Sequence, residues 1–296
     1  MSTPGSISAP LLTLTPPPPT VPNVHLSLPR PHILLVTLSR PRALNAIPTA
    51  QHLAMAALWE WYDAQLSLRC AILTGAAEGR AFCAGADLKE WDQKQRGEMP
   101  DLSHYTPEQR ERYTRMGFGG LSNRHGKKPV IAAVNGLCFG GGMEMVVNCD
   151  LVVADGKKAK FGLPEVKRGV VAVAGALPRV VRTVGLQRAN ELALLGRTDY
   201  TAEEMRAWGV VNFVVPEGKA LEEALKVAEE MVGNSPDSVI TTREGLRLGW
   251  QPLGPVEGTN ELEDGLYKKM DGAENMKEGL RSFVEKREPR WVDSKL

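Results

Sequence analysis

The sequence predicts an α/β fold with a mostly parallel core and a helical C-terminal part. Two observations support this prediction. Short apolar strands and amphipathic helices repeat in a strand–strand–helix order over residues 24–215, which is typical of parallel sheets covered by helices. From residue 220 onward the pattern is helical, with breaks at 233–236 and 250–255.

The first strand–strand–helix unit follows an unusual N-terminal segment. Residues 1–22 are rich in Ser, Thr and Pro, and predict a disordered or extended arm. Structure is expected from about residue 24, and residues 26–28 and 33–38 predict a pair of strands joined by a proline-containing turn. An apolar face at helical spacing predicts a helix over 49–65, and residues 70–74 predict a short buried strand.

The later strand–strand–helix units have weaker turn and cap signals, but their elements follow in the same order. Thr201 and Glu204 form the spacing of a capping box, which predicts a helix start. The remaining predictions are a small-residue loop at 81–88 leading into a helix, a surface loop at 93–107, a helix at 108–123, strands at 130–134, 151–154, 159–161 and 210–215, and helices ending at 184 and 195.

Composition restricts the classes of function. The net charge of +1 gives no bulk attraction for nucleic acid or an anionic membrane. The 4 cysteines are scattered in apolar contexts, which predicts reduced, buried thiols. The histidines lack metal-ligand spacing, so we expect no metal, and no apolar run has membrane-spanning length.

Three consecutive glycines mark the candidate site. Gly140, Gly141 and Gly142 follow a buried strand and precede a helix that carries Glu144 in its first turn. Glycines let a backbone approach a ligand closely, and a helix start directs free N–H groups toward it. This pattern suits an oxyanion-binding site beside a general acid/base. Taken alone it also fits a tight turn whose glutamate only complements the helix dipole.

Several ordered motifs resemble the enoyl-CoA hydratase/isomerase family, the crotonase superfamily. They are RPRALNA at 40–46, AFCAGADLKE at 81–90, KKPVIAAVNGLCFGGGMEM at 127–145, FGLPEVKRG at 161–169 and KEGLRSFVEKR at 277–287. The resemblance implies a spiral of ββα units over 23–215 and a helical oligomerisation region over 216–296. It also implies a homotrimer that commonly pairs into a hexamer.

The resemblance assigns roles to particular positions. The N–H groups of Ala86 and Gly141 would form the oxyanion hole, and Glu144 and Glu165 would be the two catalytic glutamates. The residues matching positions that contact the coenzyme A part of a substrate are Ala43, Asn45, Ala84, Ala86, Asp87, Leu88, Lys89, Gly140, Gly141, Phe283 and Lys286. Coenzyme A is carried by the substrate, so no separate cofactor is expected.

The implied activity is hydration of an enoyl-CoA thioester across its 2,3 double bond, in fatty-acid or secondary metabolism. Two carboxylates in a small dry site could hold the water and exchange the α-carbon proton. A Δ3,Δ2-enoyl-CoA isomerase and a carnitinyl-CoA dehydratase-like enzyme are the alternatives; a nucleotide-binding module lacks its phosphate motifs. Residues 170–178 are bulkier than the glycine-rich run of many hydratases, which leaves the acyl group open.

The sequence ends in Ser294-Lys295-Leu296. This tripeptide matches the signal that the peroxisomal import receptor reads. We therefore expect a peroxisomal protein.

Overall fold

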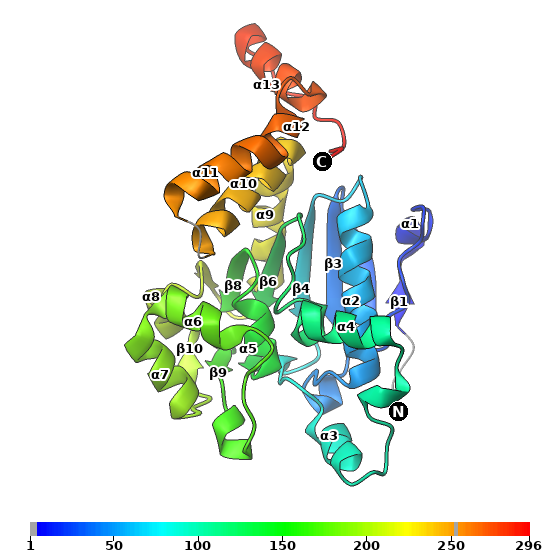
Figure 1. Cartoon of the computed structure of the whole chain (residues 1–296), viewed down its shortest axis with the longest axis vertical. Coiled ribbons are helices and arrows are strands. Elements are labelled where there is room, and N and C mark those ends of the chain that lie inside the picture. Colours follow the sequence, from blue (N-terminus) through cyan, green and yellow to red (C-terminus); the bar gives the residue numbers. More distant parts are fainter. Residues whose placement is uncertain (1–4, 252–253) are drawn as a thin grey trace.

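Two sheets and a set of helices make up the computed structural model, which describes residues 5–251 and 254–296 (Figure 1). The larger sheet has 7 strands in the order β1-β2-β3-β4-β6-β8-β11, and the smaller has 4 in the order β10-β9-β7-β5. The strands are β1 (Ser6–Ile7), β2 (Val24–Arg30), β3 (Ile33–Leu38), β4 (Cys70–Gly75), β5 (Ala81–Cys83), β6 (Val130–Val134), β7 (Leu137–Phe139), β8 (Leu151–Asp155), β9 (Lys160–Gly162), β10 (Tyr200–Thr201) and β11 (Phe213–Val215). The α/β fold is therefore confirmed.

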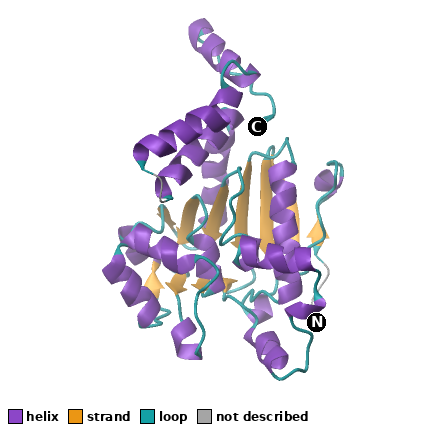
Figure 2. Ribbon diagram, viewed as in Figure 1, coloured by secondary structure: helices purple, strands orange, loops and turns teal. Residues whose placement is uncertain are grey.

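Helices cover both faces of the larger sheet and continue beyond it (Figure 2). They are α1 (Ala9–Leu12), α2 (Thr49–Ala64), α3 (Leu88–Gln95), α4 (Pro107–Met116), α5 (Gly141–Val146), α6 (Ala176–Val184), α7 (Leu186–Leu194), α8 (Ala202–Ala207), α9 (Ala220–Val232), α10 (Pro236–Trp250), α11 (Pro255–Leu262), α12 (Lys268–Met270) and α13 (Glu274–Glu285). The predicted capping box at Thr201 and Glu204 starts α8. The predicted break at 250–255 separates α10, which ends at Trp250, from α11, which begins at Pro255. Residues 252 and 253 of this break lie outside the described residues.

Side chains along the central strands alternate between the two faces of the larger sheet, and each face belongs to its own apolar layer. On β4, Cys70 and Ile72 pack with Ala224 and Ala228 of α9 on one face. Ala71 and Leu73 face the main core, which includes Trp59 and Tyr62 of α2. Since successive side chains of a strand point to opposite faces, one six-residue strand contributes to both layers. This explains its continuous apolar sequence.

The N-terminal arm differs from the prediction of disorder. Over its described residues, 5–22, Leu11 and Val21 are buried, and β1 pairs in parallel with β2. The Trp61 indole N–H donates to the Pro16 carbonyl at 2.8 Å. Apolar side chains interspersed among the prolines give the arm surface to bury against α2 and β2, which composition alone does not reveal.

Two short strands were also absent from the prediction. The residues expected to form a small-residue loop begin as β5, and β7 follows the Asn135-Gly136 turn before the glycines. Each has 3 residues, too few for an alternating pattern to be recognised. These two strands belong to the smaller sheet, which holds the candidate site.

The C-terminal helices start on the sheet and extend away from it (Figure 1). α9 covers the larger sheet, whereas α10 to α13 project beyond the ends of its strands, with Leu280, Phe283 and Val284 of α13 exposed. Arg243 of α10 is paired with Asp150 at 2.7 Å, and the second oxygen of Asp150 accepts the Val130 N–H at 2.8 Å. Over residues 5–251 and 254–296, every helix is too short or too polar to cross a membrane.

Candidate active site

The carboxyl ends of three parallel strands meet at the candidate site. β5 pairs with β7 through Cys83 and Cys138, and β7 pairs with β9 through Phe139 and Gly162. The segments that follow these strands therefore leave the smaller sheet side by side. These segments are 84–87, 140–144 and 163–165, and they carry the oxyanion donors and the two glutamates predicted from the sequence. The sheet brings together residues almost eighty positions apart in the chain.

The two predicted backbone donors lie next to each other. A Cβ placed on Gly85 would be 3.0 Å from the Gly141 nitrogen, and the φ of Gly85 is +95°. Ala86 forms an isolated parallel bridge with Ile47, in which the Gly85 carbonyl and the Asp87 N–H make the hydrogen bonds. The Ala86 N–H has no partner among the described residues, and the Gly141 N–H begins α5, where helical N–H groups lack partners. Both donors are free to bind an oxyanion.

Close packing requires two of the glycines. A Cβ on Gly141 would lie 2.5 Å from the Phe118 ring, and a Cβ on Gly142 would lie 2.2 Å from the Cys83 carbonyl oxygen. Real carbon atoms do not approach so closely, so side chains are excluded here. The reading of these residues as a simple tight turn therefore misses their role, which is to seat α5 against β5 and Phe118.

The two glutamates occupy a poorly hydrated environment. Glu144 is 4% exposed, and its Oε2 accepts the Ala176 N–H at 3.2 Å. Burial raises the pKa of Glu144 to about 7; the Ala176 N–H opposes this change, and the charge of Glu165 adds to it. Burial also raises the pKa of Glu165, whose Oε2 is buried with no hydrogen-bond partner among the described residues. Such a pair can hold and transfer a proton near neutral pH.

A cavity of about 610 Å³ lies over these groups. Its lining includes Glu144 and Glu165, together with residues of α2, α3, α4 and the loop before α6. Four residues of the predicted acyl-group segment are in its wall: Val170, Val171, Val173 and Ala174. Its size is within the range of small-molecule sites.

Comparison with known proteins identifies the family. The family model described as "Enoyl-CoA hydratase/isomerase" matches residues 30–294. The chain belongs to this family. Ala86, Gly141, Glu144 and Glu165, to which the resemblance assigns the roles of oxyanion donors and catalytic glutamates, line one cavity.

Individual members of the enoyl-CoA hydratase/isomerase family resemble the chain along nearly its whole length. A mevalonyl-coenzyme A hydratase of Beauveria bassiana is 60% identical over 96% of this chain and 100% of its own length. A mevalonyl-coenzyme A hydratase of Aspergillus fumigatus is 49% identical over 94% of this chain and 98% of its own. The crystal structure of enoyl-CoA hydratase EchA1 from Mycobacterium marinum has a TM-score of 0.79, with 34% identity over 92% of this chain and 99% of that one.

Not all residues that the resemblance assigns to coenzyme A binding reach the cavity. Six line it: Ala84, Ala86, Asp87, Leu88, Gly140 and Gly141. Asn45 is buried and supports the backbone, because it accepts the Arg40 N–H and donates to the Ala81 carbonyl at 2.7 Å. Ala43 and Lys89 are not among the lining residues.

Phe283 and Lys286 lie outside the cavity of their own chain. Phe283 is on α13 and is 85% exposed, and Lys286 ends that helix with a positive φ of 53°. α13 projects away from the smaller sheet (Figure 1). Within one chain, the structure does not bring these two residues to the coenzyme A path.

Sequence reasoning missed the aromatic residues of the wall, among them His52, Tyr113 and Phe118. His52 comes from α2, and the other two come from α4 and the turn that follows it. The bridge between Ile47 and Ala86 places the start of α2 beside the site. No local pattern predicts such a contact between distant segments.

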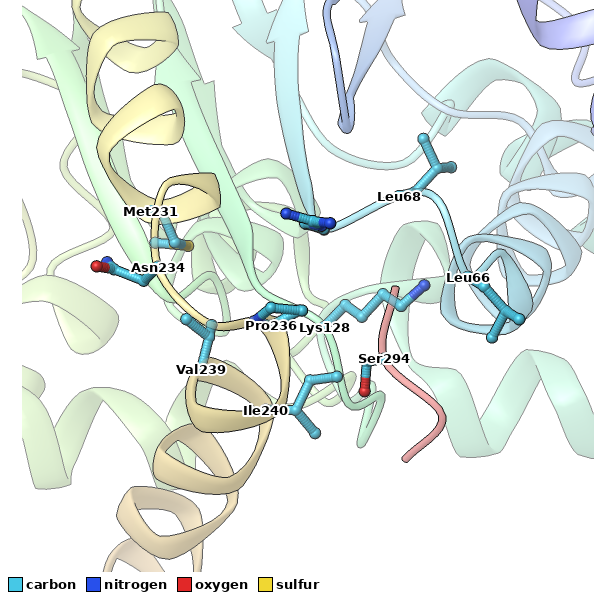
Figure 3. A pocket seen from close by; sticks show the side chains of 10 residues that line it. Leu66, Leu68, Lys128, Met231, Asn234, Pro236, Val239, Ile240 and Ser294 are labelled. Atoms are coloured by element: carbon cyan, nitrogen blue, oxygen red, sulfur yellow. The ribbon is translucent and has the colours of Figure 1, made fainter. Parts of the chain in front are cut away.

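A second cavity is unsuited to an acyl group. It measures about 10 Å³ and lies under the C-terminal tail, between Leu66, Lys128, Ile240 and Ser294 (Figure 3). Ser294 is only 5% exposed. This cavity is a packing space where the tail returns to the core.

Proposed function

We propose that this protein is a hydro-lyase that reversibly interconverts mevalonyl-CoA and its 2,3-unsaturated dehydration product. The reaction class rests on one observation: buried Glu144 and half-buried Glu165 line the same cavity as the two free N–H donors. The substrate proposal rests on the two mevalonyl-coenzyme A hydratases, which match the chain over nearly their whole lengths. A mevalonyl group carries a hydroxyl on C3, which leaves, and another on C5.

The proposed mechanism uses each group once. Glu165, ionised, removes a proton from C2, and the electrons move toward the thioester oxygen. The Ala86 and Gly141 N–H groups stabilise the resulting enolate oxygen, a contribution whose loss typically costs about 10²–10³ in rate. The C3–O bond then breaks, and Glu144 donates its proton to the leaving hydroxyl, which departs as water. Hydration follows the same steps in reverse, with Glu144 deprotonating water.

The raised pKa of Glu144 supports its role as the acid. Burial brings its pKa to about 7, so a substantial fraction carries a proton at neutral pH. Proton transfer is most effective when the pKa of the group is near the working pH. The two carboxylates titrate together, so a pH–rate profile reports the pair.

The test is turnover of mevalonyl-CoA, followed through the ultraviolet absorbance of the conjugated thioester. Glu144→Gln and Glu165→Gln should each lower kcat by roughly 10²–10⁴. Glu203→Gln, which changes an exposed carboxylate of α8, is the matched control and should retain activity. Absence of turnover by the wild type would contradict the proposal. Conversion of a 3-enoyl-CoA to a 2-enoyl-CoA without hydration would instead identify an isomerase.

We further propose that α10 to α13 assemble the protein into a homotrimer or hexamer, in which Phe283 and Lys286 reach coenzyme A bound by a neighbouring subunit. Exposed apolar side chains on α13 support this proposal, since single chains rarely expose so many together. Lys286 would then supply a cation for phosphate.

Peroxisomal import through Ser294-Lys295-Leu296 is a separate proposal, supported by the tripeptide itself. In the folded chain Lys295 is 85% exposed on its side chain, whereas Ser294 is buried. The tail must therefore leave its place for a receptor to read it. A fluorescent protein fused to the N-terminus should enter peroxisomes with the tail intact and remain outside them when the tripeptide is deleted.

A further inference from the structure

Arg179 is a half-buried arginine near the start of α6, the helix that begins at Ala176. α6 packs beside α5, which carries Glu144 (Figure 1). In the described part of the chain, Arg179 is outside the set of residues that line the catalytic cavity. It is therefore placed to act on Glu144 through the protein and not by contact with a substrate.

All three nitrogens of the Arg179 guanidinium donate to oxygen atoms, and each acceptor belongs to a different segment. Nε donates to Asn148 Oδ1 at 2.8 Å, just after α5. Nη1 donates to the Gly175 carbonyl at 2.9 Å, directly before α6, and Nη2 donates to Asn123 Oδ1 at 3.0 Å, in the segment after α4. A guanidinium holds its donors in a rigid planar fork, so these bonds fix the three segments relative to one another.

A buried serine anchors the segment 174–176 from its other end. Ser122 is fully buried, and its hydroxyl donates to the Ala174 carbonyl at 2.5 Å. Gly175, the next residue, has a φ of +128°, and a Cβ there would be 2.7 Å from both Arg179 Nη1 and the Ser122 carbonyl oxygen. The carbonyl groups of two consecutive residues are therefore held, one by the serine and one by the arginine.

The segment fixed in this way supplies a hydrogen bond to Glu144. The Ala176 N–H, the first of α6, donates to Glu144 Oε2 at 3.2 Å. The Ala174 and Ala176 backbone groups oppose the rise in the pKa of Glu144. The positive charge of Arg179 opposes it too, whereas the negative charge of Glu165 adds to it. Arg179 and the segment it holds thus favour the ionised form of Glu144.

We propose that Arg179 is a positioning residue for Glu144. Its hydrogen bonds hold the segment 174–176 so that the carboxyl group of Glu144 stays in place to exchange a proton with the hydroxyl at C3. This deepens the proposed function and rests on it for the role of Glu144. A purely structural arginine that only joined α5 to α6 would affect stability and leave the proton transfer unchanged.

Turnover of mevalonyl-CoA by Arg179→Met tests this role, because methionine fills part of the space without a charge or a donor. kcat should fall roughly tenfold to a hundredfold, since small displacements of a reacting group are costly. KM should change less than about threefold, because the arginine does not line the cavity. Arg206→Met, which changes an exposed arginine of α8, is the matched control and should keep the wild-type kcat.

A titration of the Glu144 carboxyl group separates positioning from a loss of folded protein. Infrared difference spectroscopy follows the protonated carboxyl group, with the spectrum of Glu144→Gln subtracted to isolate its band. Arg179→Met removes a positive charge and the bond that orders the Ala176 N–H, so the midpoint should move to higher pH. Arg206→Met should leave the midpoint unchanged. Hydration, which needs ionised Glu144, should reach its full rate at a higher pH in Arg179→Met than in the wild type.

Each result supports or overturns the proposal. A wild-type kcat in Arg179→Met overturns it, and so does a lowered kcat with an unchanged midpoint. If Arg179→Met does not fold, Arg179→Lys replaces it, because lysine keeps the cation but cannot bond three separated acceptors. It should lower kcat and move the midpoint by a smaller amount in the same direction; a wild-type kcat or an unchanged midpoint overturns the proposal. Absence of mevalonyl-CoA turnover by the wild type would refute the proposed function, and the midpoint would still decide whether Arg179 acts on Glu144.

Discussion

Replacing Glu144 by Gln should change how stability depends on pH. The pKa of Glu144 is raised from 4.5 to about 7 in the folded protein, chiefly by burial. Below pH 4.5 both the folded and the unfolded chain hold the proton. Between pH 4.5 and about 7 the folded protein keeps a proton that the unfolded chain has released, so the free energy of unfolding falls as pH rises. Above this range the full cost of the buried charge applies.

The magnitude follows from the size of the pKa change. At about 1.4 kcal/mol per pKa unit, the wild type should lose up to about 3 kcal/mol across this pH range through Glu144. Glutamine has nearly the same shape and does not titrate, so Glu144→Gln should lack this loss. The variant should therefore gain stability relative to the wild type as pH rises from 5 to 8.

Urea unfolding at several pH values measures this difference. The free energies of unfolding are compared for the wild type, Glu144→Gln and the exposed-site control Glu203→Gln, at equal protein concentration because assembly affects stability. A difference between Glu144→Gln and wild type that stays constant from pH 5 to pH 8 would refute the reasoning. A change of the same size in Glu203→Gln would assign the effect to net charge instead.

Three further predictions concern packing and assembly. Gly142→Ala should lower the melting temperature strongly, because its Cβ would lie 2.2 Å from backbone, while Gly249→Ala, with open space on α10, should raise it slightly; equal effects would contradict the packing account. Asp150→Asn should lower the free energy of unfolding by about 1.5–3 kcal/mol in urea titrations, because it weakens the carboxylate's hydrogen bonds to the Val130 N–H and to Arg243 of α10. An unchanged free energy of unfolding would show that these bonds do not contribute to stability. Phe283→Asp should give folded monomers by light scattering, because the side chain is exposed and apolar; a monomeric wild type would refute the assembly proposal.

Local patterns were sufficient for the longer elements. Three predictions that depend on residues within a single element are confirmed. They are the apolar spacing of α2, the capping box of α8 and the continuous apolar residues of β4. The arm could not be predicted in the same way. Its order depends on the hydrogen bond from Trp61 and on burial of Leu11 against distant elements.

The α/β class and the motifs could be predicted from the sequence, and the family resemblance of those motifs implied the four groups expected at the oxyanion site. These are local properties, since a glycine or a glutamate at a given spacing is visible in the chain itself. Only the tertiary structure decided that β5 and β7 are strands, that their ends place Ala86 beside Gly141, and that His52 enters the cavity wall. The reason is physical: contacts between short strands and distant helices depend on pairing and burial, which no single segment encodes.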